Sequence, residues 1–295
     1  MNRIIVRVFT SLMFKTQFAI RIRNLELAFK LMSNYAISAT KVENLFEKLF
    51  EVLQIKHPLN QKIIRIGSQN DGGYLLIDDF NSNQIVISLG VGQNIDAEFE
   101  LAELGLNIWM FDGTISRLPR RHNKFKFHPL NVCGIIDVTK SHQGLTTLNQ
   151  IFDQVIMIQK PETFIFNGLC KNPLLILLID IEGSEYEALL QLNEMQLSYC
   201  KQITVEFHNV FSELSSAKSR IIECINKLNM THEIISVHGN NYGGSIQVND
   251  MDFPDVIEIS WASKTSYEFV SKKNTFNHPL SSPNNCKLRD LNHLW

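Results

Sequence analysis

The sequence lacks several features, and each absence narrows what the protein can be. It contains no uninterrupted run of about eighteen apolar residues, so we expect no helix that spans a membrane. The formal net charge is only −2, and a nucleic-acid partner would normally require a strongly basic face. The five cysteines are scattered and form no CxxC pair, which predicts reduced thiols rather than a disulfide or zinc framework. Together these absences are typical of a cytoplasmic globular protein.

Acidic residues are scarce near the N-terminus. Residues 1–30 contain six lysines and arginines but only one acid, Glu26. Such a segment could lie on an anionic membrane surface as a basic amphipathic helix, or it could be a targeting peptide. We favour a third interpretation, a helical extension over residues 1–60 that packs on the main domain, and we leave peripheral membrane contact through residues 1–35 open.

The remaining chain is expected to form one main domain and a tail. Its length of 295 residues suffices for a substantial core. We place the main domain at residues 61–265 and a polar tail at residues 266–295. Because the tail is rich in Asn, Ser and Pro, we expect it to be mobile from Lys272 onward.

The most informative stretch begins at residue 85. It consists of an apolar, β-branched run at 85–89, the glycines Gly90 and Gly92, an amphipathic segment at 95–104, and an apolar run at 108–111. This order predicts a strand, a glycine turn, a helix and a second strand. Glycine lets the backbone approach a ligand closely, and the first N–H groups of the helix have no partner within it.

Asp112 directly follows the second strand. An acid at this end of a parallel strand can accept hydrogen bonds from the hydroxyls of a ribose. Two glycines after a strand can also reflect tight packing alone, but together with Asp112 they favour a nucleoside site lined by Gly90 and Gly92. A dinucleotide fingerprint would need a third glycine where this chain has Ile95. S-adenosylmethionine, which has a ribose but no phosphate, therefore fits better.

Acidic residues follow two later strands. The run at 174–179 is apolar without alternation, which predicts a central parallel strand buried on both faces. Asp180 and Glu182 follow it, while Glu206 and His208 end the next strand. Since side chains alternate along a strand, each pair lies on one side, and neighbouring strands would bring the pairs together at the carboxyl edge of the sheet.

Such a cluster cannot stay fully ionised in apolar surroundings without a bound cation, a shared proton or a basic substrate. Alternatively, one acid caps a helix and the others face water. We take Glu182, Glu206 and His208 as candidate catalytic residues, and His238 as a weaker candidate. A divalent cation stays possible, and we assign no residue as a metal ligand.

Further elements are predicted from local patterns. Capping boxes place helix starts at Thr40 with Glu43 and at Ser184 with Glu187. A hairpin is predicted at 63–80, where Arg65, Asn70 and Asp71 are placed to close over a ligand if the segment is more than a plain hairpin. Other predicted elements are strands at 125–130, 203–207, 233–237 and 256–261 and a helix at 213–228.

Seven strands follow from residue 85 onward, and the last two are joined by a modest loop. We therefore expect an α/β fold with a Rossmann-like, seven-stranded, mostly parallel sheet, a reversed last strand and helices on both faces. This is the plan of class I methyltransferases that use S-adenosylmethionine.

Beyond this plan, several segments resemble the FkbM family of methyltransferases. They lie within residues 63–262 and are RIGSQNDGGYLL, SLGVGQNIDAEFELA, MFDGTI, LLIDIEGSEYEAL, ITVEFHNVF, and HGNN followed by FPDVIEISW. The chain departs from the family pattern at Asn94, which replaces a further glycine, and at Gly113, where a proline is common.

The resemblance implies an S-adenosylmethionine-dependent methyltransferase that methylates a hydroxyl of a sugar, glycan or small metabolite. By position, Gly90, Gly92 and Asp112 would hold the cofactor, and Asp180 with Glu182 would border its methionine end and the acceptor. Two alternatives stay open. One is a nicotinamide-dependent oxidoreductase, which the missing third glycine disfavours, and the other is a non-catalytic interaction protein with the same fold.

Overall fold

The computed structural model describes most of the main domain. The described residues are 20–22, 39–134, 144–159, 165–166, 169–170, 172–215, 219–248, 251–271 and 278–291. The predictions for the basic segment 1–35 fall outside these ranges, apart from one short strand. Within them, no helix is long and apolar enough to cross a membrane.

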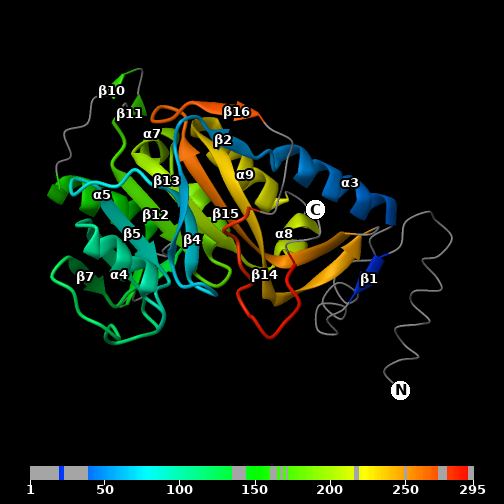
Figure 1. The fold of residues 1–295 in the computed structure, drawn as a ribbon, viewed down its shortest axis with the longest axis horizontal. Helices are drawn as coiled ribbons and strands as arrows, with labels where there is room; N and C mark the ends of the chain where they lie inside the picture. The colour runs from blue at the N-terminus through cyan, green and yellow to red at the C-terminus, as the bar shows by residue number, and fades with distance from the viewer. Residues whose placement is uncertain are drawn as a thin grey trace, which may run out of the picture.

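One large sheet organises the fold, with the strand order β1-β14-β15-β13-β12-β5-β6-β7 (Figure 1). Its strands are β1 (Ile20–Ile22), β5 (Ile85–Leu89), β6 (Asn107–Phe111), β7 (Phe125–His128), β12 (Leu175–Ile179), β13 (Cys200–Phe207), β14 (His232–Val248) and β15 (Met251–Ser263). Neighbouring strands are parallel from β7 through β6, β5 and β12 to β13. Strand β15 runs antiparallel to both β13 and β14. The seven strands from β5 to β15 thus confirm the mostly parallel sheet with a reversed last strand, and β1 extends its edge beside β14.

The central strands β5 and β12 are apolar at every position but Ser88 because both faces of the sheet are covered. All residues of β5 and β12 are buried. Alternation sends Ile85 and Ile87 into one core cluster and Val86 into another. The first cluster is covered by α3 (Ala39–Val52), α5 (Leu148–Gln159), α6 (Glu185–Gln191), α7 (Glu194–Ser198), α8 (Val210–Ser215) and α9 (Arg220–Thr231). The second is covered by α4 (Asp96–Glu103) and the hairpin of β3 (Ile63–Gly67) and β4 (Gly73–Ile77).

Three short strand pairs complete the described elements. They are β2 (Lys56–Pro58) with β16 (Phe269–Ser271), β8 (Asn131–Cys133) with β9 (Leu145–Thr147), and β10 (Ile165–Phe166) with β11 (Leu169–Cys170).

Both predicted capping boxes are wrong. Helix α3 already begins at Ala39, so Thr40 lies inside it. Ser184 does precede α6, but its side chain makes no capping hydrogen bond. The neighbouring Glu185 carboxylate accepts hydrogen bonds from backbone N–H groups of the preceding loop instead.

The single helix predicted at 213–228 is also wrong. The structure has two helices, α8 and α9, and Ser219 at the start of α9 has a φ of 47°. A left-handed conformation cannot continue a right-handed helix. The prediction also made the last two strands too short, because β14 and β15 extend as a long hairpin at the edge of the sheet (Figure 1).

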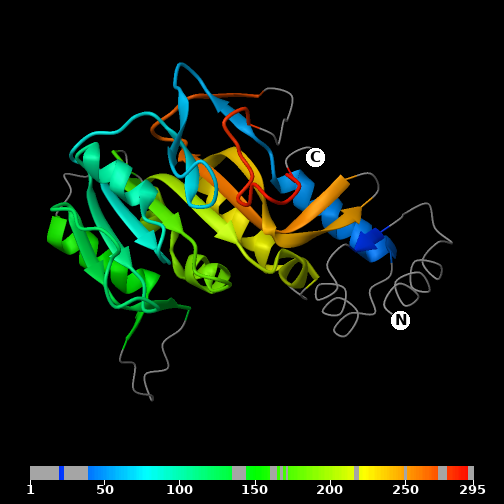
Figure 2. The ribbon, with the colours of Figure 1, turned by 60° about the horizontal axis from the view of Figure 1, so that its bottom comes forward.

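The mobile tail that we predicted is wrong for residues 278–291, which we call the C-terminal segment. In Figure 2 this segment, in red, lies beside the β3–β4 hairpin. The Asp71 backbone N–H donates to the Asn284 carbonyl at 3.2 Å, and the Asn285 N–H donates to Asn241 Oδ1 at 2.8 Å. The segment therefore connects the hairpin turn to β14.

A buried histidine anchors the start of β14. His232 is 0% exposed, its Nε2 lies 2.9 Å from the Cys200 carbonyl oxygen, and its Nδ1 lies 2.7 Å from Thr231 Oγ1. A neutral ring satisfies both partners by donating from Nε2 and accepting at Nδ1. Burial lowers the pKa of His232 to about 4.

Candidate functional site

The glycine turn after β5 is shaped by close contacts on one side and open space on the other. Gly90 has a φ of 76°, and a Cβ added there would lie 1.5 Å from the Asp180 carbonyl oxygen, so only glycine fits. Gly92 has a φ of 58°, but a Cβ there would meet no atom within 4 Å. The turn thus presses against the end of β12 at Gly90 and exposes its backbone at Gly92.

Asp112 closes this turn. Its Oδ2 accepts a hydrogen bond from the Gly92 N–H at 2.7 Å. Its Oδ1 accepts two from Thr114, from the N–H at 2.7 Å and from Oγ1 at 2.6 Å. Burial alone would raise the pKa of Asp112, but these hydrogen bonds lower it below the ordinary value. The Ile115 backbone also contributes to lowering this pKa. Since a carboxylate offers about four acceptor positions, an ionised Asp112 would accept a bond from a ribose hydroxyl by sharing one of them.

The first turn of α4 is unsuited to a pyrophosphate. Ile95 at its N-cap makes no side-chain capping bond, and Asp96 and Glu98 place acids in the first turn. Glu98 is buried, accepts a hydrogen bond from Ser88 Oγ at 2.6 Å, and has a pKa raised by burial. Acids already occupy the positions where a helix N-terminus would attract phosphate, which agrees with the missing third glycine.

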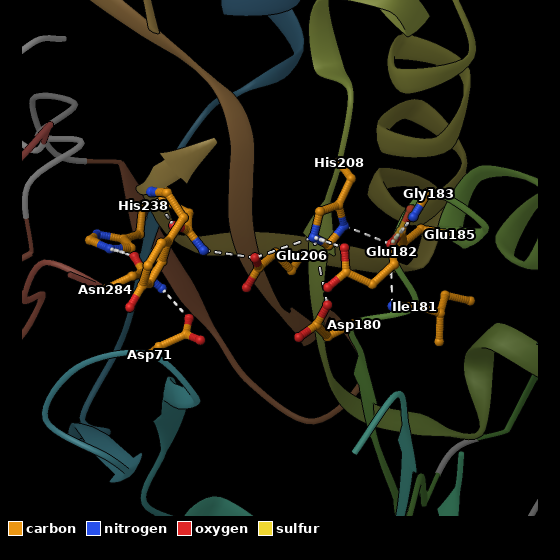
Figure 3. A network of polar contacts seen from close by, with 12 residues as sticks. Asp71, Asp180, Ile181, Glu182, Gly183, Glu185, Glu206, His208, His238 and Asn284 are labelled. Atoms are coloured by element: carbon orange, nitrogen blue, oxygen red, sulfur yellow. Dashed lines mark hydrogen bonds and ion pairs between the residues drawn. The ribbon is translucent and has the colours of Figure 1, made fainter. Parts of the chain in front are cut away.

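The predicted acidic residues do come together, around His208 (Figure 3). The ring Nε2 of His208 lies 3.7 Å from Asp180 Oδ1, 3.5 Å from Glu182 Oε2 and 3.5 Å from Glu206 Oε1. These residues follow or end the adjacent parallel strands β12 and β13, so the cluster forms at the carboxyl edge of the sheet, as alternation predicted.

Glu185 is a member of this cluster that the sequence reasoning missed. It is 0% exposed, and its Oε1 lies 2.9 Å from His208 Nδ1. The same oxygen accepts hydrogen bonds from the N–H groups of Ile181 and Gly183. Glu185 therefore fixes both the histidine ring and the loop that carries Glu182. A signal was present, an acid three residues after Glu182, but it was interpreted only as part of a helix start.

The cluster retains protons near neutral pH. Burial, aided by the charges of Glu182 and Glu185, raises the pKa of Asp180 to about 7, while His208 opposes the shift. Burial alone would lower the pKa of His208, but the hydrogen bond to Glu185 and the surrounding carboxylates raise it to about 9. Burial and the charge of Asp180 also raise the pKa of Glu206 well above its ordinary value. These directions fit the shared-proton alternative among those left open by the sequence.

A row of polar residues extends from Glu206 across the reversed strand. Glu206 accepts a hydrogen bond from Asn240 Nδ2 at 2.8 Å and is the register partner of Glu258 on β15. Glu258 is buried, and burial raises its pKa to about 8 against the opposing charge of Arg65. Glu258 was missed because it lies inside an apolar strand pattern without any flanking motif.

Two hairpin residues that we expected to close over a ligand, Arg65 and Asp71, bond to other residues of the protein. Arg65 donates to the backbone carbonyls of Ser68 and Asn70, and so it shapes its own turn. Asp71 Oδ1 accepts a hydrogen bond from Asn284 Nδ2 at 3.0 Å.

The weaker candidate, His238, contacts the C-terminal segment. Its Nε2 lies 2.9 Å from Asn284 Oδ1, so Asn284 of the C-terminal segment lies between Asp71 and His238 (Figure 3). Asn94 Nδ2 donates to the Asp71 carbonyl at 2.7 Å. This bond links Asp71 to the segment that follows the glycine turn. Nothing in the sequence places Asn284 here, because it is more than two hundred residues from Asp71.

Two groups of residues could hold ligands. At the glycine turn, Gly90, Gly92 and Asp112 surround the open backbone. At the cluster, Asp180, Glu182 and His208 each offer one ligand atom, and these atoms lie within 4.8 Å of one another.

The strand order, the reversed β15 and the glycine turn at the carboxyl edge define the class I methyltransferase fold. No family model matches the chain, so the resemblance to the FkbM family stays a prediction. No curated protein matches it either.

Two solved structures show a distant likeness. One is a fibrillarin pre-rRNA processing protein from Methanococcus jannaschii, with 10% identity and a TM-score of 0.32, covering 70% of this chain and 83% of that one. The other is a Pyrococcus horikoshii protein described as an RNA methyltransferase, with 9% identity and a TM-score of 0.29, covering 89% of this chain and 99% of that one. At these values neither likeness indicates a substrate for this chain.

Proposed function

We propose that the protein is an S-adenosylmethionine-dependent methyltransferase that acts on a hydroxyl of a sugar, glycan or small metabolite. One observation carries the proposal. An ionised acid bonded into a glycine turn, and a cluster of acids around a histidine, lie on one edge of the sheet. The contact between Gly90 and the Asp180 carbonyl joins these two groups.

The residues at the glycine turn fit the cofactor. Gly92 leaves space above the backbone, and Asp112 can accept a bond from a ribose hydroxyl. The acids of the α4 first turn would repel the phosphates of a nicotinamide dinucleotide but not the phosphate-free S-adenosylmethionine. When bound, this cofactor supplies a methyl group on a positively charged sulfur, and the carbon–sulfur bond breaks to leave a neutral thioether.

The residues of the cluster would position the acceptor hydroxyl and remove its proton. His208, with its raised pKa, carries a proton at neutral pH and is suited to orienting the acceptor. Glu206 is 6% exposed and is held by Asn240. Burial raises its pKa well above the ordinary value, so its carboxylate is a stronger base than an exposed one. We therefore favour Glu206 over Glu182, which is 85% exposed, as the base.

Calorimetric titration of the purified protein with S-adenosylhomocysteine, with NAD as the control ligand, tests the cofactor. We expect saturable binding of S-adenosylhomocysteine alone, at micromolar affinity on the order of 8 kcal/mol. Binding of NAD alone would favour the oxidoreductase, and binding of neither by the folded protein would favour the interaction protein.

The acceptor class is tested next, by transfer of a labelled methyl group to a panel of sugars, glycans and hydroxylated metabolites. The Glu206→Gln variant should bind S-adenosylhomocysteine normally and lose turnover. Equal turnover of the variant and the wild type would remove Glu206 as the base.

A further inference from the structure

We infer that Asp180, Glu182 and His208 form a binding site for one divalent transition-metal cation, with Mn²⁺ as the best-suited probe. The inference deepens the proposed function, because the ion would lie where the acceptor is expected. Binding of the ion itself, however, does not depend on methyl transfer.

The spacing of the ligand atoms suits a metal ion. Ligands that surround an ion octahedrally at about 2.1 Å are about 3.0 Å apart when adjacent and about 4.2 Å apart when opposite. His208 Nε2 lies 3.5 Å from Glu182 Oε2 and 3.7 Å from Asp180 Oδ1. Both distances fall between these limits, so a central ion requires only small side-chain movements.

The histidine is held as metal-binding histidines usually are. A ligating imidazole commonly donates its second N–H to a carboxylate, which fixes the tautomer and the orientation of the ring. Glu185 Oε1 occupies that position, 2.9 Å from His208 Nδ1. Nδ1 donates to Glu185, and a bound ion would displace the proton from Nε2, the atom that faces Asp180 and Glu182.

Two oxygens in the cluster are independently short of partners. Asp180 Oδ1 and Glu185 Oε2 are buried and have no hydrogen-bond partner among the described residues. Glu185 itself is 0% exposed. An unsatisfied buried carboxylate oxygen costs free energy, and a cation bound by Asp180 would recover that cost for Oδ1. Asp180 Oδ1 lies 3.7 Å from His208 Nε2, on the side of the ring where Glu182 Oε2 also lies, so it faces the proposed site.

The ligand set favours Mn²⁺ over other common ions. Two carboxylates and one imidazole are fewer oxygens than Ca²⁺ takes, and the nitrogen is less suited to Mg²⁺. There is no thiolate in the group, as a structural zinc site would often have. Positions left open on the ion would be available to the acceptor hydroxyl, whose pKa the ion would lower.

Manganese binding can be measured directly on the whole protein. Unbound Mn²⁺ gives a strong electron paramagnetic resonance signal, and its loss on titration reports binding. Nitrogen from a coordinated histidine adds a characteristic modulation to the pulsed signal. Both readouts are made without cofactor or acceptor.

The variants are chosen so that folding does not decide the result. Glu182→Gln changes an exposed carboxylate and should fold normally. Glu187→Gln is the matched control, because Glu187 lies only five residues further along, on helix α6, and its carboxylate pairs with Arg220 instead. His208→Gln tests the nitrogen ligand, and Asp180→Asn the third ligand.

We expect one saturable Mn²⁺ site in the wild type and in Glu187→Gln. Glu182→Gln and Asp180→Asn should weaken binding by about tenfold or more, on the scale of changes to a metal site. The nitrogen modulation should disappear in His208→Gln. Absence of a saturable site, or wild-type affinity in folded Glu182→Gln, would overturn the inference. Titration of S-adenosylhomocysteine in the presence of a chelator keeps the proposed function separately testable.

Discussion

Alanine at Gly92 should mainly weaken cofactor binding, whereas alanine at Gly90 should mainly destabilise the fold. At Gly92, the methyl group would face open space, so the main cost is the left-handed φ of 58°, about 1–2 kcal/mol. At Gly90 the same conformational cost applies, and the Cβ would also lie 1.5 Å from the Asp180 carbonyl oxygen. Relieving that overlap requires β5 and β12 to shift, which adds about 1–3 kcal/mol or more.

The two variants therefore separate folding from binding. Gly92→Ala should lower the melting temperature by about 2–4 °C per kcal/mol and should remain folded. Its affinity for S-adenosylhomocysteine should fall by about tenfold or more, equivalent to 1.4 kcal/mol, because the methyl group would take space over the turn. Gly90→Ala should unfold at a clearly lower temperature than Gly92→Ala or accumulate as insoluble protein.

Thermal unfolding and calorimetric titration measure these two effects on the same samples. If Gly92→Ala bound S-adenosylhomocysteine as tightly as the wild type, the cofactor would not lie over this turn. If Gly90→Ala were as stable as Gly92→Ala, the close approach of Gly90 to Asp180 would not control the packing of the two strands.

Three further changes have expected outcomes of similar clarity. Asp112→Ala should weaken S-adenosylhomocysteine binding by about 1–3 kcal/mol, the scale of hydrogen bonds to a charged group, and unchanged calorimetric affinity would remove Asp112 from the site. The free energy of unfolding of the wild type, measured in urea relative to His232→Gln, should fall by about 1 kcal/mol between pH 7.5 and pH 5.5. The reason is that the unfolded histidine, with a pKa near 6.5, binds a proton that the buried ring, with a pKa of about 4, still excludes; a pH-independent difference would contradict the buried neutral ring. Tyr186→Phe should cost about 0.5–1.5 kcal/mol of unfolding free energy, because the hydroxyl donates to the His208 carbonyl at 2.8 Å, and a variant as stable as the wild type would show that this bond contributes nothing.

The sheet could be predicted because its central strands have a local signature. The run at 174–179 is apolar at every position and the run at 85–89 at every position but Ser88, and such runs are typical of a strand covered on both faces. The same rule of alternation placed Asp180, Glu182, Glu206 and His208 at one edge, since it depends on neighbours within each strand and on the order of two strands.

The incorrect predictions share a different cause, because they depend on contacts made outside the local window. Ser184 and Glu187 have the spacing of a capping box. The Glu185 carboxylate nevertheless accepts from the loop N–H groups and also contacts His208, which directly follows another strand. Ser219 interrupts a helix whose apolar pattern gave no sign of a break. Glu258 and Asn284 joined the site through strand pairing and a long-range contact, neither of which a single sequence reveals.

The position of Asn284 has a consequence for how the protein is made. Asn284 follows Asp71 by 213 residues, so their contact cannot form until all the residues between them have left the ribosome. Contacts of such long sequence separation are slow to form, because the entropy of closing the intervening loop must be overcome first. The hairpin turn beside the cofactor site would thus reach its final hydrogen bonding only in the last stage of folding, after the sheet itself had assembled.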